Sequence, residues 1–137
     1  MEKLSGNDRI KDKVEEIEKY LEELYSVEIG SLDDYKADFK IRAICERYFE
    51  KIVEAVEDLA FFVARDRGIE IVDEDKVFGS LAKGDIISDE LAGKLKEAKG
   101  MRNIIAHEYG EIDDGLVYET ITGELEGDVR EFLGVVG

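Results

Sequence analysis

Apolar residues recur every three or four positions through the first half of the chain, which is the spacing of one face of an α-helix. This stripe predicts a helix from about residue 7 to 29, with Asn7 as its N-cap and Gly30 ending it. The stripe consists of Ile10, Val14, Ile17, Leu21 and Leu24.

A second and longer stripe predicts a helix from about residue 34 to 67. Its apolar positions are Ile41, Cys45, Tyr48, Ile52, Ala55, Val56, Leu59 and Val63. Ser31, Asp33 and Asp34 supply capping side chains before it, and no glycine or proline interrupts it until Gly68. Two long helices joined by a short turn are expected to pack antiparallel as a hairpin.

The segment that follows the second stripe is more broken. Residues 69–72, with the sequence IEIV, are briefly strand-like, and a short helix is expected at about 75–82. Ser88 then precedes a third long helix, which should end near Tyr109 and Gly110.

Apolar spacing resumes after Ile112 and predicts one last helix. It would carry Val117, Ile121, Leu125, Val129, Phe132 and Leu133. Gly123 and Gly127 lie within it, each costing about 1 kcal/mol relative to alanine. The patterns together predict an all-α fold, an antiparallel bundle of four to five helices forming a single domain over residues 1–137.

Length and composition fit a water-soluble globule. Hydrophobic residues make up 44% of the 137 residues and charged ones 39%, which excludes disorder. No apolar run approaches the roughly 20 residues that span a bilayer, and the N-terminus has no secretion signal. We therefore expect a cytoplasmic protein without a membrane partner. The single cysteine, Cys45, fits a reducing compartment and is expected to be a buried structural thiol.

Metal and cofactor chemistry find little support in the sequence. One histidine and one cysteine cannot form a soft-ligand cluster, and the carboxylates are too scattered to indicate a metal site. We expect no metal and no cofactor, so any catalysis should be metal-free.

The net charge of −16 argues against nucleic-acid binding, because phosphate affinity comes largely from lysine and arginine. One stretch departs from this average. Lys94, Lys96, Lys99 and Arg102 are opposed only by Glu97, a local excess of three positive charges. It is either a basic approach to a site or an ordinary solvated helix face.

That stretch leads into the candidate chemical segment, RNIIAHEY, which runs from Arg102 to Tyr109. Five residues turn a helix through about 500°, so Arg102 and His107 would point about 140° apart. They can converge on one phosphate only through a local distortion, a helix end near His107, or a partner chain. Asn103 and His107 are four apart and meet naturally.

The pattern of Arg102, four residues, His107, one residue and Tyr109 resembles the HEPN superfamily of helical nucleotide-binding and ribonuclease proteins. Within it, the chain is similar to the HepT-like toxins of toxin–antitoxin pairs. The resemblance covers essentially the whole chain, including the helical hairpin, the late motif and the acidic turn before a closing helix.

The resemblance implies a homodimer in which two motif copies form one composite cleft for RNA. His107 would move a proton off the ribose 2′-OH or onto the leaving 5′-oxygen, since imidazole is the side chain that titrates nearest neutrality. Arg102 would hold the phosphate with its guanidinium fork, and Asn103 would support His107 or the substrate. The product would carry a 2′,3′-cyclic phosphate.

Tyr109 corresponds to the tyrosine that receives AMP from a partner nucleotidyltransferase antitoxin of the MNT type in the HepT-like toxins. Added phosphates would repel RNA and silence the cleft. The competing interpretation is that Tyr109 only packs at the core or its rim.

Two other functions stay open. A noncatalytic nucleotide-binding or nucleotidyltransferase-partner module would use Arg102 and His107 to grip a phosphate without cleaving it, and the acidic net charge favours this alternative. A dimeric structural protein is the other. Four basic residues of the first two helices are either phosphate contacts or, as we expect, solvated charges: Lys36, Lys40, Arg42 and Arg47.

Overall fold

The computed structural model describes residues 6–107 and 112–137. Within these ranges the chain is all-α, with seven α-helices, one short 3₁₀ helix and no strand. The elements are α1 (Gly6–Tyr25), α2 (Leu32–Ala37), α3 (Phe39–Asp66), η1 (Glu74–Lys76), α4 (Val77–Lys83), α5 (Asp89–His107), α6 (Asp114–Thr122) and α7 (Leu125–Val136). The all-α prediction is confirmed, whereas the predicted four to five helices are too few.

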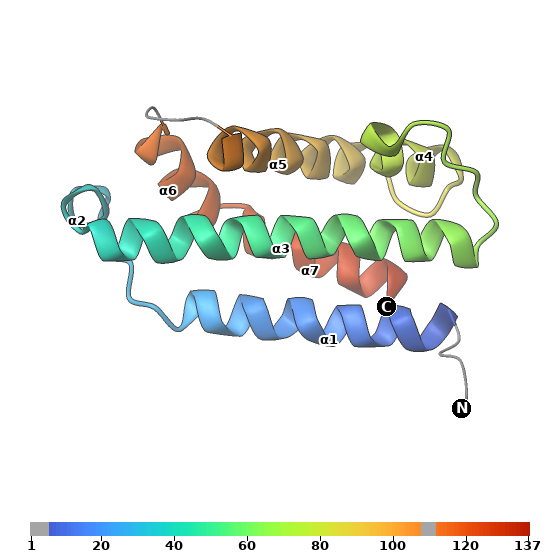
Figure 1. Cartoon of the computed structure of the whole chain (residues 1–137), viewed down its shortest axis with the longest axis horizontal. Helices are drawn as coiled ribbons and strands as arrows, with labels where there is room; N and C mark the ends of the chain where they lie inside the picture. Colours follow the sequence, from blue (N-terminus) through green and yellow to red (C-terminus); the bar gives the residue numbers. More distant parts are fainter. Residues whose placement is uncertain (1–5, 108–111) are drawn as a thin grey trace.

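The four longest helices, α1, α3, α5 and α7, alternate in direction along the chain (Figure 1). Helix α1 lies antiparallel along α3, as the predicted hairpin requires, and α5 packs against α3 and α7. The short helix α4 packs against both α3 and α5. Helix α3 therefore forms the centre of the bundle, with α5 on the opposite side from α1.

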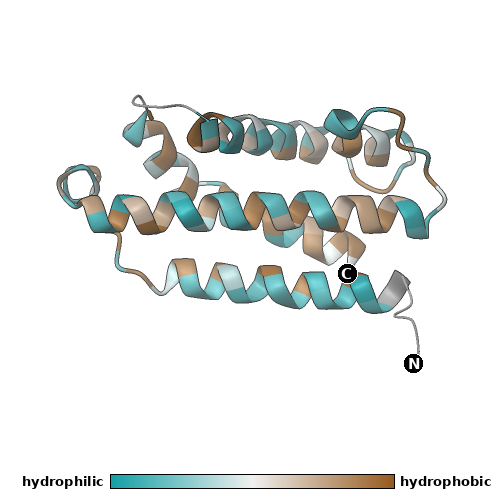
Figure 2. Cartoon of the chain, viewed as in Figure 1, coloured by the Kyte–Doolittle hydropathy of each residue, from teal (hydrophilic) through white to brown (hydrophobic). Residues whose placement is uncertain are grey.

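Helix α3 is central because it buries more than one face. Its buried residues are Cys45, Phe49, Ile52, Val53, Ala55, Val56, Leu59, Ala60, Val63 and Ala64. Helix α1 instead buries a single stripe through Ile17, Leu21 and Leu24, and its visible face is mostly hydrophilic (Figure 2). No buried residue among those described is polar or charged. Burial of apolar surface thus holds the bundle together, and Cys45 is the buried thiol that the sequence predicts.

The first two predicted helices have different bounds in the structure. Helix α1 ends at Tyr25 and not near residue 29, and the left-handed Gly30 lies in the connection that follows. The predicted helix over 34–67 is two helices, because Asp38 adopts an extended conformation between α2 and α3. Its carboxylate accepts hydrogen bonds from the backbone N–H groups of Lys40 and Ile41, which starts a new helix.

The prediction of one last helix is also wrong. Helices α6 and α7 are separated at Gly123, where a β-carbon would lie only 2.6 Å from the Glu119 carbonyl oxygen. Residues 69–72 form a loop and not a strand, since the described chain offers no strand for them to pair with. The short helix at 75–82 is confirmed by η1 and α4. The predicted helix end at Tyr109 and Gly110 lies outside the described residues.

None of the helices in the described part of the chain has the length and apolar character needed to cross a membrane.

Candidate active site

Helix α5 carries Arg102, Asn103 and His107 of the candidate motif and is anchored at both ends of its described length. The Ser88 hydroxyl accepts a hydrogen bond from the Leu91 backbone N–H at 3.0 Å, which caps the first turn as the sequence predicts. Leu91, Leu95 and Ile105 are buried against the core. The helix therefore presents Arg102 and His107 from a fixed backbone.

Arg102 lies in the seam between α5 and α3, with 26% of its side chain exposed. Its Nη2 is 3.6 Å from the Glu54 Oε2 on α3, and its Nη1 donates to the Asn103 Oδ1 at 3.3 Å. Its Nε is buried and has no hydrogen-bond partner within the described residues. The guanidinium is thus oriented by α3, and Nη1 and Nη2, each of which carries two N–H groups, keep donor capacity for a further acceptor.

His107 and Asn103 are both exposed, and α5 is regular through His107. The regular helix separates the directions of Arg102 and His107 by about 140°. Over the described residues, one chain alone does not bring these two side chains together. Asn103 shares a face with His107, but the described contacts include no hydrogen bond between them, and Asn103 instead accepts from Arg102.

Tyr109 lies outside the described residues, so its predicted role is untested by the geometry.

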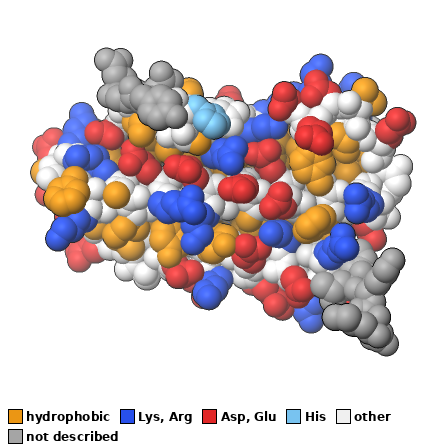
Figure 3. All heavy atoms as spheres, in the orientation of Figure 1, with side chains coloured by type: hydrophobic (Ala, Val, Ile, Leu, Met, Phe, Trp, Pro, Cys, Tyr) orange, Lys and Arg blue, Asp and Glu red, His pale blue; other side chains and the backbone are white. Residues whose placement is uncertain are grey.

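The basic stretch before the motif is largely neutralised by acidic groups, most of them from other elements. Lys94 pairs with Asp128 on α7 and Glu90, and Lys99 lies 3.4 Å from Glu57 and 3.5 Å from Asp75. Figure 3 shows acidic and basic side chains interspersed over the visible face. The local excess of three positive charges in the sequence does not survive as a uniformly basic surface. The Glu90–Lys94 pair is an i,i+4 pair that helix spacing can indicate, whereas the pairs with Asp128, Glu57 and Asp75 join different elements and cannot be found from one helix.

Lys96 is the exception in this stretch. It is exposed and has no ion-pair partner within the described residues.

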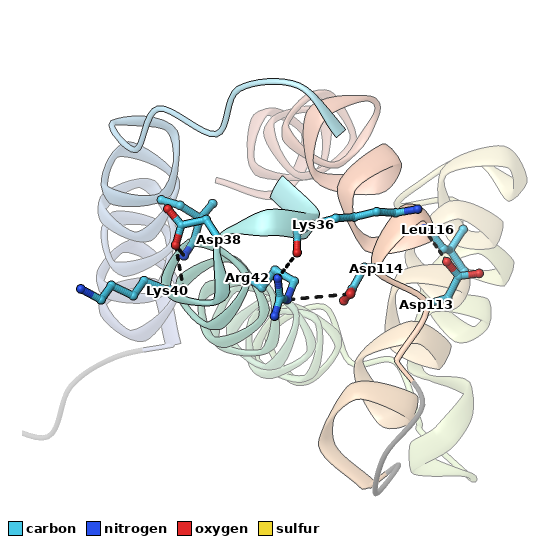
Figure 4. Close-up of polar contacts among 8 residues, drawn as sticks. Lys36, Asp38, Lys40, Arg42, Asp113, Asp114 and Leu116 are labelled. Atoms are coloured by element: carbon cyan, nitrogen blue, oxygen red, sulfur yellow. Dashed lines mark hydrogen bonds and ion pairs between the residues drawn. The ribbon is translucent and has the colours of Figure 1, made fainter. Parts of the chain in front are cut away.

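Arg42 on α3 connects the end of α2 to the start of α6 (Figure 4). Its Nη1 donates to the Lys36 carbonyl oxygen at the end of α2, and its Nε is 3.8 Å from the Asp114 Oδ2 at the start of α6. Asp113 caps the same helix by accepting from the Leu116 N–H at 3.0 Å. Arg42 is therefore a tertiary link and not a freely solvated charge.

Two neighbouring side chains on α3 titrate abnormally. Burial raises the pKa of the Cys45 thiol to about 11, which makes it a poor nucleophile near neutral pH. Burial also raises the pKa of Glu46, and the nearby Asp114 adds to this effect. No group of three or more potential metal ligands occurs among the described residues.

Comparison with known proteins shows the family to which this chain belongs. A model described as "Ribonuclease HepT-like" matches residues 10–136. The chain belongs to the HepT-like ribonuclease family. The match includes Arg102, Asn103, His107 and Tyr109, so the whole motif lies inside the HepT-like region.

Two curated relatives of this HepT-like chain are nucleases. It is 31% identical to a tRNA nuclease HepT of Aphanizomenon flos-aquae over 85% of the chain and 80% of that protein. It is 28% identical to an mRNA nuclease HepT of Shewanella oneidensis over 95% of the chain and 97% of that protein.

One similar solved structure is the tri-AMPylated HEPN toxin of Shewanella oneidensis in complex with an MNT antitoxin. It is 27% identical, with a TM-score of 0.85 over 94% of this chain and 96% of that chain. The arrangement of helices described above is thus the HEPN fold.

Proposed function

We propose that this chain is the toxin of a toxin–antitoxin pair, a cytoplasmic, metal-independent endoribonuclease with Arg102 and His107 in its catalytic site. The observation that carries the proposal is the position of this pair. This chain belongs to the HepT-like ribonuclease family, and its only histidine, His107, is exposed at the end of the described part of α5. Arg102 lies on the same helix within its last two described turns.

The chemistry follows from the two side chains. The His107 imidazole takes the proton of the ribose 2′-OH as the 2′-oxygen attacks phosphorus, and the bond from phosphorus to the 5′-oxygen breaks. The proton is then delivered to the leaving 5′-oxygen. Arg102 binds two phosphate oxygens and stabilises the charge that grows on them. The products are a 2′,3′-cyclic phosphate and a 5′-hydroxyl.

The site is composite and requires a homodimer. Because α5 directs Arg102 and His107 about 140° apart, two copies of the chain facing each other bring Arg102 of one protomer toward His107 of its partner. Asn103 supports the site from the same face as His107, through its contact with Arg102.

A second candidate function is supported by charge. Glu54 lies beside Arg102, and Lys94 and Lys99 are engaged by acidic residues, so the positive field available to RNA is small. A noncatalytic nucleotide-binding or nucleotidyltransferase-partner module would tolerate this field better than a nuclease. Such a module binds phosphate through Arg102 without turnover.

We also propose that a partner nucleotidyltransferase antitoxin of the MNT type transfers AMP to Tyr109. The other five tyrosines are poor acceptors. Tyr35 is buried, and the hydroxyls of the remaining four donate hydrogen bonds to protein oxygens at 2.8 to 3.0 Å. These four are Tyr20, Tyr25, Tyr48 and Tyr118. The relative from Shewanella oneidensis, which is AMPylated and bound to an MNT antitoxin, supports the proposal.

The test is incubation of total cellular RNA in EDTA with protein whose mass confirms an unmodified Tyr109. The wild type is expected to cleave it to products with cyclic phosphate ends, whereas His107→Ala binds RNA without cleaving it. The control is Asp12→Ala, which replaces an exposed residue on α1 and is expected to retain cleavage. If neither the wild type nor the variants cleave although both bind RNA, the noncatalytic module is the better description.

A further inference from the structure

A cavity of about 530 Å³ lies between α4, the loop at 69–73 and the first half of α5. It is separate from the seam that holds Arg102. The side chains that decide its chemistry are Lys76, Lys83, Lys96, Ser80, Ile69 and Val72.

Three ammonium groups border this cavity. Lys76, Lys83 and Lys96 are exposed, and none has an ion-pair partner within the described residues. The Lys96 Nζ lies over Gly79, 3.5 Å from where a β-carbon of that residue would be. The absence of a side chain at Gly79 therefore leaves the Lys96 ammonium group accessible from the cavity.

The cavity also contains two acidic residues, Glu70 and Asp73. Asp73 is engaged at the start of η1, where its Oδ1 accepts from the Asp75 N–H at 3.0 Å. Three cations against two carboxylates give an excess of positive charge, in a chain whose net charge is −16. An anionic ligand is thus favoured here more than over the acidic remainder of the surface.

An apolar wall accompanies the lysines. Ile69 packs its side chain toward Gly84, where a β-carbon would come within 2.7 Å of the Ile69 Cδ1. Val72 is 89% exposed, which is unusual for a large apolar residue. A ligand that matches both features has an apolar, flat part for Ile69 and Val72 and a phosphate for the lysines. A nucleotide has both parts.

The cavity lies in line with the proposed catalytic histidine. Lys96 and His107 are eleven residues apart, so the helix makes three turns and about 20° between them, and both residues lie on one exposed face of α5. Their separation along the helix axis is about 16 Å. Asn103 lies on the same face between them. A single RNA strand running along this face would reach both the cavity and His107.

We propose that the cavity between α4 and α5 is a nucleotide subsite for RNA that extends from the scissile phosphate. The inference rests on the proposed ribonuclease function and adds to it where the substrate is held. Lys83 and Lys96 bind backbone phosphate, while Ile69 and Val72 contact a base. The subsite provides RNA affinity that the acid-paired residues Lys94, Lys99 and Arg102 cannot provide alone.

The test measures RNA affinity in the His107→Ala background, which prevents cleavage. A fluorescein-labelled single-stranded RNA of about 16 nucleotides is titrated over a range of salt concentrations. The test variant is Lys83→Ala/Lys96→Ala. The matched control is Lys11→Ala/Lys19→Ala, which removes the same charge from two exposed positions on α1. Thermal unfolding confirms that both double variants fold like the parent.

The subsite predicts about tenfold weaker binding for Lys83→Ala/Lys96→Ala, and a plot of log affinity against log salt whose slope is shallower by about 1.4. The control should match the parent. Equal weakening in both double variants, or none in either, would overturn the subsite.

Cleavage by the protein with an intact His107 is scored separately. If the protein cleaves RNA but the two double variants bind RNA equally well, the subsite proposal is wrong and the ribonuclease proposal stands. The predicted difference in binding without any cleavage overturns the ribonuclease proposal and leaves the cavity as an RNA-binding site of a noncatalytic module. No RNA binding at all removes both.

Discussion

Arg102 on α5 and Glu54 on α3 form an ion pair, with 3.6 Å between Nη2 and Oε2. The carboxylate is 60% exposed, so the pair lies at the surface and contributes little to stability. It does occupy one edge of the guanidinium that we propose for phosphate binding. Glu54 therefore both orients Arg102 and competes with the substrate phosphate.

Replacing Glu54 by glutamine should tighten RNA binding. An exposed ion pair is worth roughly 0.2 to 1 kcal/mol, so removing the competing charge predicts about 1.4- to fivefold higher affinity. Glu90→Gln is the matched control, because it removes the same charge from an exposed partner of Lys94. Affinities are compared in the His107→Ala background. Equal changes in both variants would show that only net charge matters, and weaker binding by Glu54→Gln would show that orientation outweighs competition.

The break between α6 and α7 predicts opposite effects at two glycines. Gly123→Ala should destabilise the protein, since the new β-carbon would lie 2.6 Å from the Glu119 carbonyl oxygen. Gly127→Ala is the control: it lies inside α7 with open space around it and should stabilise by about 0.5 to 1 kcal/mol. Urea unfolding measures both changes. Stabilisation by Gly123→Ala would mean that the chain accepts one continuous helix there.

Cys45 should be unreactive in the folded protein. Its thiol is fully buried, and burial raises its pKa to about 11. A thiol reagent at pH 8 should therefore label the protein only as fast as it unfolds, and labelling should be rapid in concentrated urea. Prompt labelling of the native protein would contradict this burial.

The same thiol should make stability depend on pH in the alkaline range. The unfolded thiol ionises near pH 8.5, below the folded pKa of about 11, so the contribution of Cys45 is complete below about pH 8.5 and is lost as pH rises toward 11. The free energy of unfolding of Cys45→Ala should fall less over this range than that of the wild type. Identical pH profiles would exclude the contribution.

Much of the fold could be predicted from the sequence because the core is apolar and helical in period. The stripes through Leu21, Ile52 and Leu95 located α1, α3 and α5, and all three residues are buried. The errors occur where a local hydrogen bond or steric contact overrides the apolar period. Asp38 is both the C-cap of α2 and the N-cap of α3. Gly123 separates α6 from α7 although the apolar spacing continues from one helix to the next.

The candidate site was predictable as a motif but not as a geometry. The spacing of Arg102 and His107 on a helix gave their divergence, and the regular α5 agrees with it. The pairing of Arg102 with Glu54 joins residues from two helices, which no pattern along one helix reveals. The sequence does not predict the cavity at Lys76, Lys83 and Lys96 either, because the three lysines lie on three different elements, η1, α4 and α5.

The most direct test of the composite site mixes two inactive variants. Arg102→Ala and His107→Ala are each expected to lose RNA cleavage in EDTA. In a mixed dimer, one of the two Arg102–His107 pairs across the composite cleft still combines an intact Arg102 from one protomer with an intact His107 from its partner. We therefore predict that unfolding and refolding the two variants together restores cleavage, whereas each variant refolded alone remains inactive. If the mixture forms mixed dimers and stays inactive although the wild type refolds to full activity, Arg102 and His107 do not act across two chains.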